Sequence, residues 1–575
     1  MHPEILHIDL TAATSRRVPC DAPALGCARG GRGLAGLLLA SSLATAFADN
    51  APRPVWGAPG AAVCFAPGRL AGFDLPGAGH VSLAFFSPRT GGAAVATLGG
   101  SLGHALARAR LAGVVLTGRS ARPVGLAIRD DAVGFVDAAG LAGRTTTEIF
   151  DSLLGEYDAA AVTGPAALSG SPLATVAADR WHDAGGTGAG LALAAKNLVF
   201  LAVAGTAEVR PADAAGLDAA RAAMERLIAA APALAGPCGF GRFGTAALVD
   251  LTAGRRMQPT DNFRRTFFPE SPAVNAPCLE TLFQGHGETC PGCPVGCRRV
   301  DATGRLLPDV DALSHFTALL GLADPDLAVF ARQYCLEQGL DAAGCAVVLA
   351  AEAERTGEAP APGRVRRGLA SLAAMDAAGR ALVAAPALRV KGVELPAFDP
   401  RGACGLALSL AVGASGPDPW RAGCLAHELL RKPVATDRFT FEGKARAVFL
   451  GEAAVAAVAC LAGCPWLGLA IGLEEWALAL AAVTGEPVAA GDLAALGQAV
   501  VAREHAQNAR CGLTAADGDL PRRFFAEPGS GGDGIDVPPL DRAAFLAARA
   551  KYYRLCGLSA EGLPLAAPRE APWTR

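Results

Sequence analysis

Apolar positions along the chain follow two different patterns, and the pattern changes near residue 210. Up to that point short apolar runs alternate with Gly, Pro and Asp, which is typical of strands and hairpins. Asp130 and Asp131 interrupt one run and predict a turn between two strands. The runs that predict strands most clearly cover residues 80–86, 112–118, 123–138 and 197–205.

Beyond residue 211 the apolar residues recur at helical spacing, with Gly or Pro at the ends of the segments. We expect helices within 211–232, 326–340, 342–357, 474–485 and 492–509. A β-rich first third followed by a helical remainder predicts an α+β fold. The stretch 396–418 is rich in Gly, Ala and Pro and predicts a boundary inside the helical part. The expected domains are therefore 1–210, 211–417 and 418–575.

Composition and charge exclude two classes of protein. The chain has 575 residues, of which 51% are hydrophobic, and a formal net charge of -3. High apolar content with little net charge is the opposite of the signature of disorder. Because 51 Lys and Arg are matched by 54 Asp and Glu, no long-range positive field attracts phosphates, and we expect no nucleic-acid partner.

A mean hydropathy of +0.32 requires a search for membrane spans. The best candidate is the uncharged run of 21 residues from Ala453 to Leu473, which is long enough to span a bilayer. It contains Cys460, Cys464 and Pro465 and has no flanking Lys or Arg, so we expect a buried helix, a turn and a second helix instead. The first residues lack the pattern of a secretory signal, which predicts a cytoplasmic protein.

One group of cysteines stands out among the sixteen in the chain. Cys290, Cys293 and Cys297 have C-x2-C-x3-C spacing, with Pro and Gly between them. Pro and Gly prevent regular helix and let the loop curl, so that three thiolates can converge. A [4Fe-4S] cluster takes four Cys ligands and would need a fourth from elsewhere in the chain. A zinc knuckle and a metal-free loop are the alternatives, although no second pair of Cys or His follows nearby.

With this loop and other segments in view, the chain resembles the aldehyde ferredoxin oxidoreductase family, nearly from end to end. Each segment is weak alone, but their order and spacing together are specific. The segments include GGRGLAGLLLA (30–40), SPRTGGAAVATLGGSLG (87–103), HDAGGTGAGLALAAKNLVFLAVAGT (182–206), PTDNF (259–263), TCPGCPVGCRRV (289–300), DPRGACGLALSLAVG (399–413) and CGLTAADGDLPRRFF (511–525). The resemblance implies an N-terminal β-sheet domain that forms the base for two pterins, followed by two mainly helical domains.

The resemblance also implies an activity, cofactors and partners. The activity is the oxidation of a small-molecule aldehyde to a carboxylic acid. The cofactors are tungsten or molybdenum held by two pterins and a neighbouring [4Fe-4S] cluster, with Mg²⁺ between the pterin phosphates as an option. The electrons pass to a ferredoxin or an electron-transfer subunit. The resemblance leaves a homodimer as one option for the assembly of the chain.

Residue by residue, the resemblance assigns three cluster ligands to Cys290, Cys293 and Cys297. The family's fourth ligand ends a D-x-x-G-L-C motif, which reads here from Ala459 to Cys464, so Cys464 is the fourth ligand and Cys460 the alternative. The apolar run around Cys464 would then give the cluster a dry surrounding, which helps to set its potential.

The companion motif of the family, which holds a pterin, is retained as Asp341 and Gly344. A carboxylate suits a pterin because the amino and ring N–H groups of the pterin edge can donate two parallel hydrogen bonds. Taken alone, Asp341 would be read as a helix N-cap. The equivalent Asp of the other motif is Ala459, so one pterin site is supported and the other is weakened.

The N-terminal pterin base departs further from the family. Thr97, Gly99 and Gly100 stand where the family has an Asn and a Gly pair near the Mg²⁺. The family's Arg-containing loop reads His182 to Gly188 here, with Asp183, Gly185 and Gly188 as the residues assigned to the pterin. Glycine amides can still hold phosphate, whereas the missing arginine charges cannot be supplied by glycine.

Three residues are candidates for catalysis. Asp309 and Asp311 replace the glutamates of the family's P-E-Y-E-T-L segment, and either could take a proton from the attacking water. His427 is the nearest candidate for a pocket histidine, displaced by two positions, and a solvated or core histidine is the alternative reading.

The lost polar residues keep other functions open. The chain could be a divergent paralogue or an electron-transfer subunit that keeps the fold and the cluster without efficient aldehyde chemistry. It could also act on a different redox substrate at the same metal site.

Overall fold

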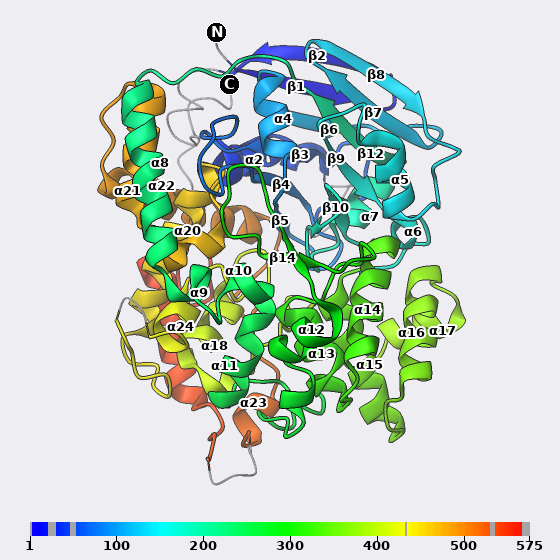
Figure 1. Ribbon diagram of the computed structural model, residues 1–575, viewed down its shortest axis with the longest axis vertical. Coiled ribbons are helices and arrows are strands. Elements are labelled where there is room, and N and C mark those ends of the chain that lie inside the picture. Colours follow the sequence, from blue (N-terminus) through cyan, green and yellow to red (C-terminus); the bar gives the residue numbers. More distant parts are fainter. Residues whose placement is uncertain (1–2, 21–29, 47–52, 432–433, 530–534, 566–575) are drawn as a thin grey trace.

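The N-terminal third forms two six-stranded sheets, as seen at the top of Figure 1. The computed structural model describes residues 3–20, 30–46, 53–431, 434–529 and 535–565. The first sheet has the order β2-β1-β6-β3-β4-β5 and the second β11-β10-β9-β12-β7-β8. The strands are β1 Glu4–Asp9, β2 Thr14–Pro19, β3 Val63–Pro67, β4 Val81–Phe86, β5 Ala93–Leu98, β6 Leu111–Thr117, β7 Val124–Arg129, β8 Ala132–Asp137, β9 Ala159–Thr163, β10 Val176–Ala178, β11 His182–Asp183 and β12 Leu198–Ala204.

The two sheets share one hydrophobic core. Buried residues of the first sheet, such as Leu83, belong to the same cluster as Leu126 and Leu201 of the second sheet. Helix α4 (Leu102–Arg108) contributes Leu106 to this cluster. The strands predicted from apolar runs are confirmed, and the turn at Asp130 joins β7 to β8. The short helices of this region are α2 Gly31–Ser41, α3 Leu43–Ala46, α5 Thr146–Leu153, α6 Pro165–Leu168 and α7 Ala189–Ala194.

The remainder of the described chain is mainly helical, and in Figure 1 most of it lies below the sheets while part lies beside them on the left. The predicted α+β fold is therefore confirmed, while the domain boundaries stay predictions. The helices on the way to residue 417 are α8 Ala214–Ala230, α9 Pro232–Ala235, α10 Phe240–Phe243, α11 Leu248–Gly254, α12 Ala276–Phe283, α13 Val310–Phe316, α14 Pro325–Gln338, α15 Ala342–Thr356, α16 Pro362–Ala374, α17 Ala377–Val383 and α18 Cys404–Val412. Two small hairpins accompany them, β13 His286–Glu288 with β14 Arg298–Val300 and β15 Arg389–Val390 with β16 Val393–Glu394.

Several of these helices begin after an aspartate whose side chain accepts a hydrogen bond from the first turn. Asp213, Asp309, Asp324 and Asp341 are N-caps of α8, α13, α14 and α15, respectively. Such a cap satisfies a backbone N–H that has no partner inside the helix, and its loss typically costs about 1 kcal/mol. These caps fix where α13 and α15 begin.

The last part of the chain forms a helical group in which α20 and α22 pack against each other. Its helices are α19 Cys424–Glu428, α20 Lys444–Cys460, α21 Leu473–Thr484, α22 Ala490–Arg510, α23 Arg523–Ala526 and α24 Arg542–Leu555. The apolar run 453–473 is the end of α20, a 3₁₀ turn at Pro465–Leu469 and the start of α21, as predicted. Among the described residues, no helix is long and apolar enough to cross a membrane.

The contact between α20 and α22 depends on one glycine. A Cβ atom at Gly497 of α22 would lie 1.8 Å from the carbonyl oxygen of Ala453 on α20. The two helix backbones can therefore approach this closely only with glycine at position 497. This approach also sets the spacing of Glu452 and Glu504, which lie on the two helices beside the contact.

We expect the substitution Gly497→Ala to lower the free energy of unfolding by about 1–3 kcal/mol, because α20 and α22 must move apart to admit the methyl group. Denaturant unfolding followed by tryptophan fluorescence measures this loss. Gly491→Ala on the same helix is the control, since a Cβ there meets nothing within 4 Å. Equal stability of the two variants would contradict the assigned contact.

Candidate functional site

Four cysteines line one cavity of about 120 Å³, here called the cysteine cavity. Cys290, Cys293 and Cys297 come from the loop between β13 and β14, and Cys464 comes from the corner after α20. The loop curls as its sequence predicts, with Gly292 and Gly296 at positive φ and the Cys293 N–H donating to the Cys290 carbonyl. Residues almost 170 positions apart in sequence thus face the same space.

Burial and neighbouring thiols raise the pKa of Cys290, Cys293 and Cys464. Burial and the neighbouring Cys297 raise the pKa of Cys290 to about 12. Burial raises the pKa of Cys464 as well, and Cys297, Cys293 and Cys290 add to that shift. Four thiolates at this place would repel each other unless a cationic group lay among them. The donor set therefore fits a group that carries several positive metal ions.

Four cysteines can hold either a single zinc ion or an iron–sulfur cluster. Four thiolates on a single zinc ion would lie about 3.8 Å from each other, given Zn–S bonds of about 2.3 Å. In the described part of the chain, no three His, Cys, Asp or Glu side chains are grouped so as to hold a single metal ion. The four cysteines around this cavity match the number of ligands that a [4Fe-4S] cluster takes.

Cys460, the alternative fourth ligand, does not line the cysteine cavity. Its side chain is fully buried near the backbone of Gly33, and its carbonyl accepts a hydrogen bond from Arg69 N. The 3₁₀ turn after α20 brings only Cys464 to the other three cysteines.

Two histidines and an arginine complete the wall of the cysteine cavity. His182 Nε2 lies 3.6 Å from Cys290 Sγ, and His80 lines the cavity with its Nδ1 3.2 Å from the Gly77 carbonyl. Arg298 lines it as well. Burial, followed by the charge of Arg298, lowers the pKa of His182 well below its ordinary value, so this imidazole is neutral.

A second cavity of about 320 Å³ adjoins the first and is here called the polar cavity. Thr97, Asp183 and Pro465 line both cavities, so they form a common wall. Two tryptophans in contact continue this wall, since Trp420 lines the polar cavity and Trp466 the cysteine cavity, with ring centroids 3.8 Å apart. The charged residues of the polar cavity are Arg32, Asp183, Asp311, Asp341, Glu394, Asp418 and Arg421.

The structure brings only part of the predicted pterin residues to the polar cavity. Thr97, Asp183, Gly185 and Asp341 line it, whereas Gly99 lines the cysteine cavity. The remaining three are near the cavities without lining them. Gly100 packs on Asp179, Gly188 caps α7, and Gly344 donates its N–H to Asp341.

Asp341 combines both roles that the sequence suggests. Its Oδ2 accepts the Gly344 N–H at 3.0 Å as the N-cap of α15, and its side chain also lines the polar cavity. Burial raises its pKa to about 7, and the charges of Asp183 and Glu394 contribute to the shift. Gly186 lies against the same carboxylate, because a Cβ there would be 2.5 Å from Asp341 Oδ2.

The two candidate catalytic aspartates occupy different environments although only Val310 separates them. Asp309 is an N-cap of α13 and pairs with Arg298 and Arg332, each at 3.4 Å, and it does not line the polar cavity. Burial alone would raise its pKa, but Arg332 and Arg298 outweigh burial and lower it. Asp311 lines the cavity, and burial followed by repulsion from Asp309 raises its pKa to about 7.

His427 is not brought to the site. It lies on α19, lines neither cavity, and places its Nδ1 3.2 Å from the Val434 carbonyl. Of the two readings of this histidine, the structure supports the non-catalytic one.

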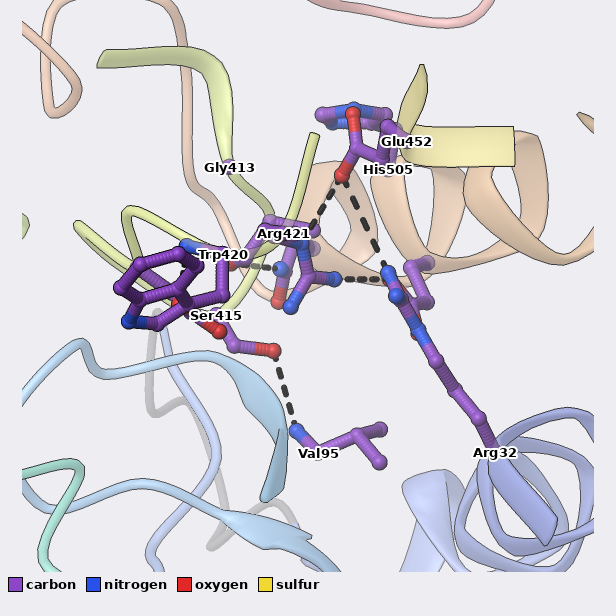
Figure 2. A network of polar contacts seen from close by, with 12 residues as sticks. Arg32, Val95, Gly413, Ser415, Trp420, Arg421, Glu452 and His505 are labelled. Atoms are coloured by element: carbon purple, nitrogen blue, oxygen red, sulfur yellow. Dashed lines mark hydrogen bonds and ion pairs between the residues drawn. The ribbon is translucent and has the colours of Figure 1, made fainter. Parts of the chain in front are cut away.

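Sequence analysis missed a buried network of charges that borders the polar cavity, seen in Figure 2. Arg32 donates from Nε and Nη2 to the two oxygens of Glu504, each at 2.7 Å. Arg421 donates from Nε to Glu452 at 2.8 Å and from Nη2 to Glu504. Tyr552 donates to Glu452, and His505 lies 3.1 Å from the Tyr552 hydroxyl. The only signal in the sequence is a lone charge inside an apolar helix, as at Glu452.

The same loop that carries Arg421 is tied to the first sheet. Ser415 Oγ accepts the Val95 N–H of β5 at 3.0 Å (Figure 2), and Asn508 of α22 accepts the Ala93 N–H at 2.8 Å. Asn508 also donates to the Ala414 carbonyl. These bonds fix the loop 413–421 over the edge strand that carries Thr97.

Comparison with known families accounts for almost the whole chain. The family model for the N-terminal domain of aldehyde ferredoxin oxidoreductase matches residues 5–205. The model for domains 2 and 3 of the same enzyme matches residues 219–358 and 367–570.

Individual relatives agree with this match. The chain is 27% identical over 500 residues to the tungsten-containing aldehyde ferredoxin oxidoreductase of Thermococcus kodakarensis, covering 80% of this chain and 82% of that protein. It is 26% identical over 537 residues to the protein of the same description from Pyrococcus furiosus, covering 87% of each. Among solved structures, the active-site complex BamBC of benzoyl coenzyme A reductase is similar in fold, with a TM-score of 0.78 and 18% identity over 98% of this chain and 95% of that chain.

The environment of Asp311 predicts how stability depends on pH. Because its pKa is about 7 in the folded state and about 3.9 in an unfolded chain, the folded state loses stability as the pH rises from about 4 to 7. Asp311→Asn removes this loss and should raise the free energy of unfolding by about 2–4 kcal/mol at pH 8, with little change at pH 4. Asp309→Asn should instead lower stability at pH 8, since it breaks two ion pairs. Urea unfolding at both pH values measures the difference, and a gain for Asp311→Asn that is equal at both would refute the assignment.

Proposed function

The chain belongs to the aldehyde ferredoxin oxidoreductase family and is an oxidoreductase, and we propose that it oxidises an aldehyde to a carboxylic acid. The reaction consumes one water and releases two protons and two electrons. The proposed cofactors are a tungsten or molybdenum ion held by two pterins and a [4Fe-4S] cluster, with a ferredoxin or an electron-transfer subunit as the acceptor.

One observation carries this proposal: a cavity lined by four cysteines shares a wall with a second cavity lined by carboxylates. Thr97, Asp183 and Pro465 are common to both. Two redox groups in these cavities would be separated by one layer of residues. Such closeness supports electron transfer from one to the other without further relay groups.

We assign the cluster to Cys290, Cys293, Cys297 and Cys464. When bound, a [4Fe-4S] cluster accepts and releases single electrons, and its potential depends on burial and on hydrogen bonds to the sulfurs. Cys464 is 8% exposed, so this side of the site is dry. His182, at 3.6 Å from Cys290 Sγ, is placed to donate a hydrogen bond to that sulfur.

The polar cavity offers Asp341, Asp183 and the backbone of residues 185–187 to a pterin. A pterin-bound tungsten or molybdenum ion supplies two-electron chemistry at a coordinated substrate. Asp341 presents a carboxylate that can accept from the N–H edge of the pterin. Gly186 lies against this carboxylate, since a Cβ atom there would come within 2.5 Å of Asp341 Oδ2, so this close contact requires glycine.

Asp311 is the residue that we propose as the general base. A base with a pKa near the working pH is largely deprotonated and still basic enough to take a proton from water. Its Oδ1 accepts the Ala397 N–H at 2.8 Å, which holds the carboxylate in the cavity wall. Asp309, with its pKa lowered by Arg332 and Arg298 against burial, stays charged and fixes the start of α13. Two neighbouring carboxyl groups with different pKa values, one ionised and one that titrates near pH 7, are typical of acid–base sites.

A second candidate function is a redox conversion other than aldehyde oxidation on the same scaffold, or a paralogue without efficient chemistry. Two observations favour it: Ala459 lines the polar cavity where the resemblance expects an aspartate, and His427 lies outside the cavity.

Metal analysis of anaerobically purified protein tests the proposed function. We expect about four Fe and one W or Mo per chain, and reduction of a viologen dye when an aldehyde is added. Iron without W or Mo would favour the paralogue. Zinc in place of iron would exclude the cluster.

The fourth ligand is tested by a pair of variants on the same corner of the chain. We expect Cys464→Ser to abolish or convert the electron paramagnetic resonance signal of the reduced cluster, because a thiolate is lost from the cluster. Cys460→Ser should leave the signal unchanged, since Cys460 does not line the cysteine cavity. The reverse result would move the ligand to Cys460.

A further inference from the structure

The charges of the polar cavity fall into two groups. Asp183, Asp311, Asp341, Glu394 and Asp418 form a carboxylate group, in which Asp418 lies on the 413–421 loop, three residues before Arg421, and the others lie on β11, α13, α15 and β16. Members of this group raise the pKa of Asp341 and Asp311. Arg32 and Arg421 come from α2 and from the loop before α19. These two arginines, together with Ala459, are called the arginine side of the cavity.

The arginine side presents positive charge to the cavity, with the compensating carboxylates behind it. Arg32 and Arg421 both line the cavity and are each 5% exposed. Glu452 and Glu504, which accept their hydrogen bonds, do not line it. The bonds from each guanidinium to these glutamates use Nε and Nη2, so Nη1 of each arginine is not engaged by them.

The glutamates hold the two arginines in a fixed geometry. Arg32 is gripped by both oxygens of Glu504, and Arg421 bridges Glu504 and Glu452. Burial alone would raise the pKa of Glu504, but Arg32 and Arg421 outweigh it and lower this pKa to about 2. Glu504 therefore stays charged at neutral pH. Guanidiniums whose positions are already set lose little freedom when they bind a further group.

Ala459 lies directly beside these arginines. A Cβ at Gly31, the neighbour of Arg32, would be 2.0 Å from the Ala459 carbonyl oxygen. Glu452, Val455 and Ala459 are three and four residues apart and lie on one face of α20. Val455, Ala459 and Gly463 line the cavity there, so the part of the wall that comes from α20 and the corner after it carries small apolar side chains and no carboxylate.

We propose that the arginine side of the polar cavity binds an oxyanion, either a carboxylate or a phosphate group, of the molecule that occupies the cavity. Planar guanidiniums match the geometry of such groups, and charge-assisted hydrogen bonds to them are about twice as strong as neutral ones. A pterin ring edge, which donates hydrogen bonds, would find no acceptor at Ala459.

Two sources of the oxyanion fit this chemistry. In the first, the substrate is an aldehyde that carries a carboxylate or phosphate in addition to its carbonyl group, and this version rests on the proposed function. In the second, the oxyanion is the phosphate of a pterin. In both cases Arg32 and Arg421 bind the oxyanion, and Ala459 places no competing carboxylate beside them.

The test compares Ala459→Asp with Ala459→Asn, which have nearly the same volume and differ in charge. Inorganic phosphate is titrated into each protein by calorimetry. We expect Ala459→Asn to bind phosphate as the unchanged protein does, and Ala459→Asp to bind it at least about tenfold more weakly, because the new carboxylate occupies the arginines. Val455→Asp and Val455→Asn repeat the comparison one turn away, in case a variant at 459 does not fold.

The source is identified on the holoenzyme with benzaldehyde and 4-carboxybenzaldehyde, which differ by one carboxylate. A substrate oxyanion predicts that the ratio of kcat/KM for the charged to the neutral aldehyde falls about tenfold in Ala459→Asp relative to Ala459→Asn. A cofactor phosphate predicts instead that Ala459→Asp loses tungsten or molybdenum and pterin, while Ala459→Asn keeps them.

Two results would overturn the proposal. The first is equal phosphate affinity of the Asp and Asn variants at both positions. The second is a higher pterin content of Ala459→Asp than of the unchanged protein, which would mean that a pterin edge lies at this side. Failure of the proposed function has a separate signature, because it appears in the unchanged protein as missing W or Mo or as no oxidation of benzaldehyde, whereas the phosphate titration requires neither.

Discussion

Four buried charges hold together parts of the chain that are more than 400 residues apart. Arg32 of α2 and Arg421 of the 413–421 loop share Glu504 of α22, and Glu452 of α20 receives Arg421. Removing such charges from water is expensive, and the cost is offset only when every partner is present with good geometry. The network therefore constrains the N-terminal helix, the loop and the two C-terminal helices at once. The position of the polar cavity follows from this constraint, because its wall is made of the same elements.

The close approach of α20 and α22 is a second condition for this network. Gly497 lets the backbone of α22 lie against Ala453, the residue next to Glu452. Arg421 can therefore bind both Glu452 on α20 and Glu504 on α22. The backbone contact between Gly497 and Ala453 thus lies next to Glu452, which takes part in the buried ion pairs. The corner that follows α20 is attached to this fixed pair of helices, and it places Cys464 in the cavity that the other three cysteines line.

Much of the fold and half of the site could be predicted from the sequence, for identifiable reasons. The spacing of apolar residues predicts the strands and helices. Pro and Gly between the cysteines predict the curled C-x2-C-x3-C loop. Asp309 and Asp311 could be named but not told apart, because their difference comes from Arg298 and Arg332, of which the latter lies on another helix. His427 could be proposed only from its order in the chain, which does not show whether its side chain reaches the cavity. For the arginine–glutamate network the sequence shows only a charge inside an apolar helix at Glu452, and it does not identify the partners, which come from other segments of the chain.

The wall shared by the two cavities also has a consequence for how proteins of this design can change. The segment from Ala459 to Pro465 contributes to both cavities, with Ala459 on one side and Cys464 on the other. A mutation there would alter the walls of both cavities together, so a change that adapts one cavity also disturbs the other. The loop 413–421 lines the polar cavity but not the cysteine cavity. It is held by hydrogen bonds from Val95 to Ser415 and from Asn508 to Ala414. New specificities would therefore be expected to arise first in that loop, which makes it the natural target for directed evolution of the enzyme.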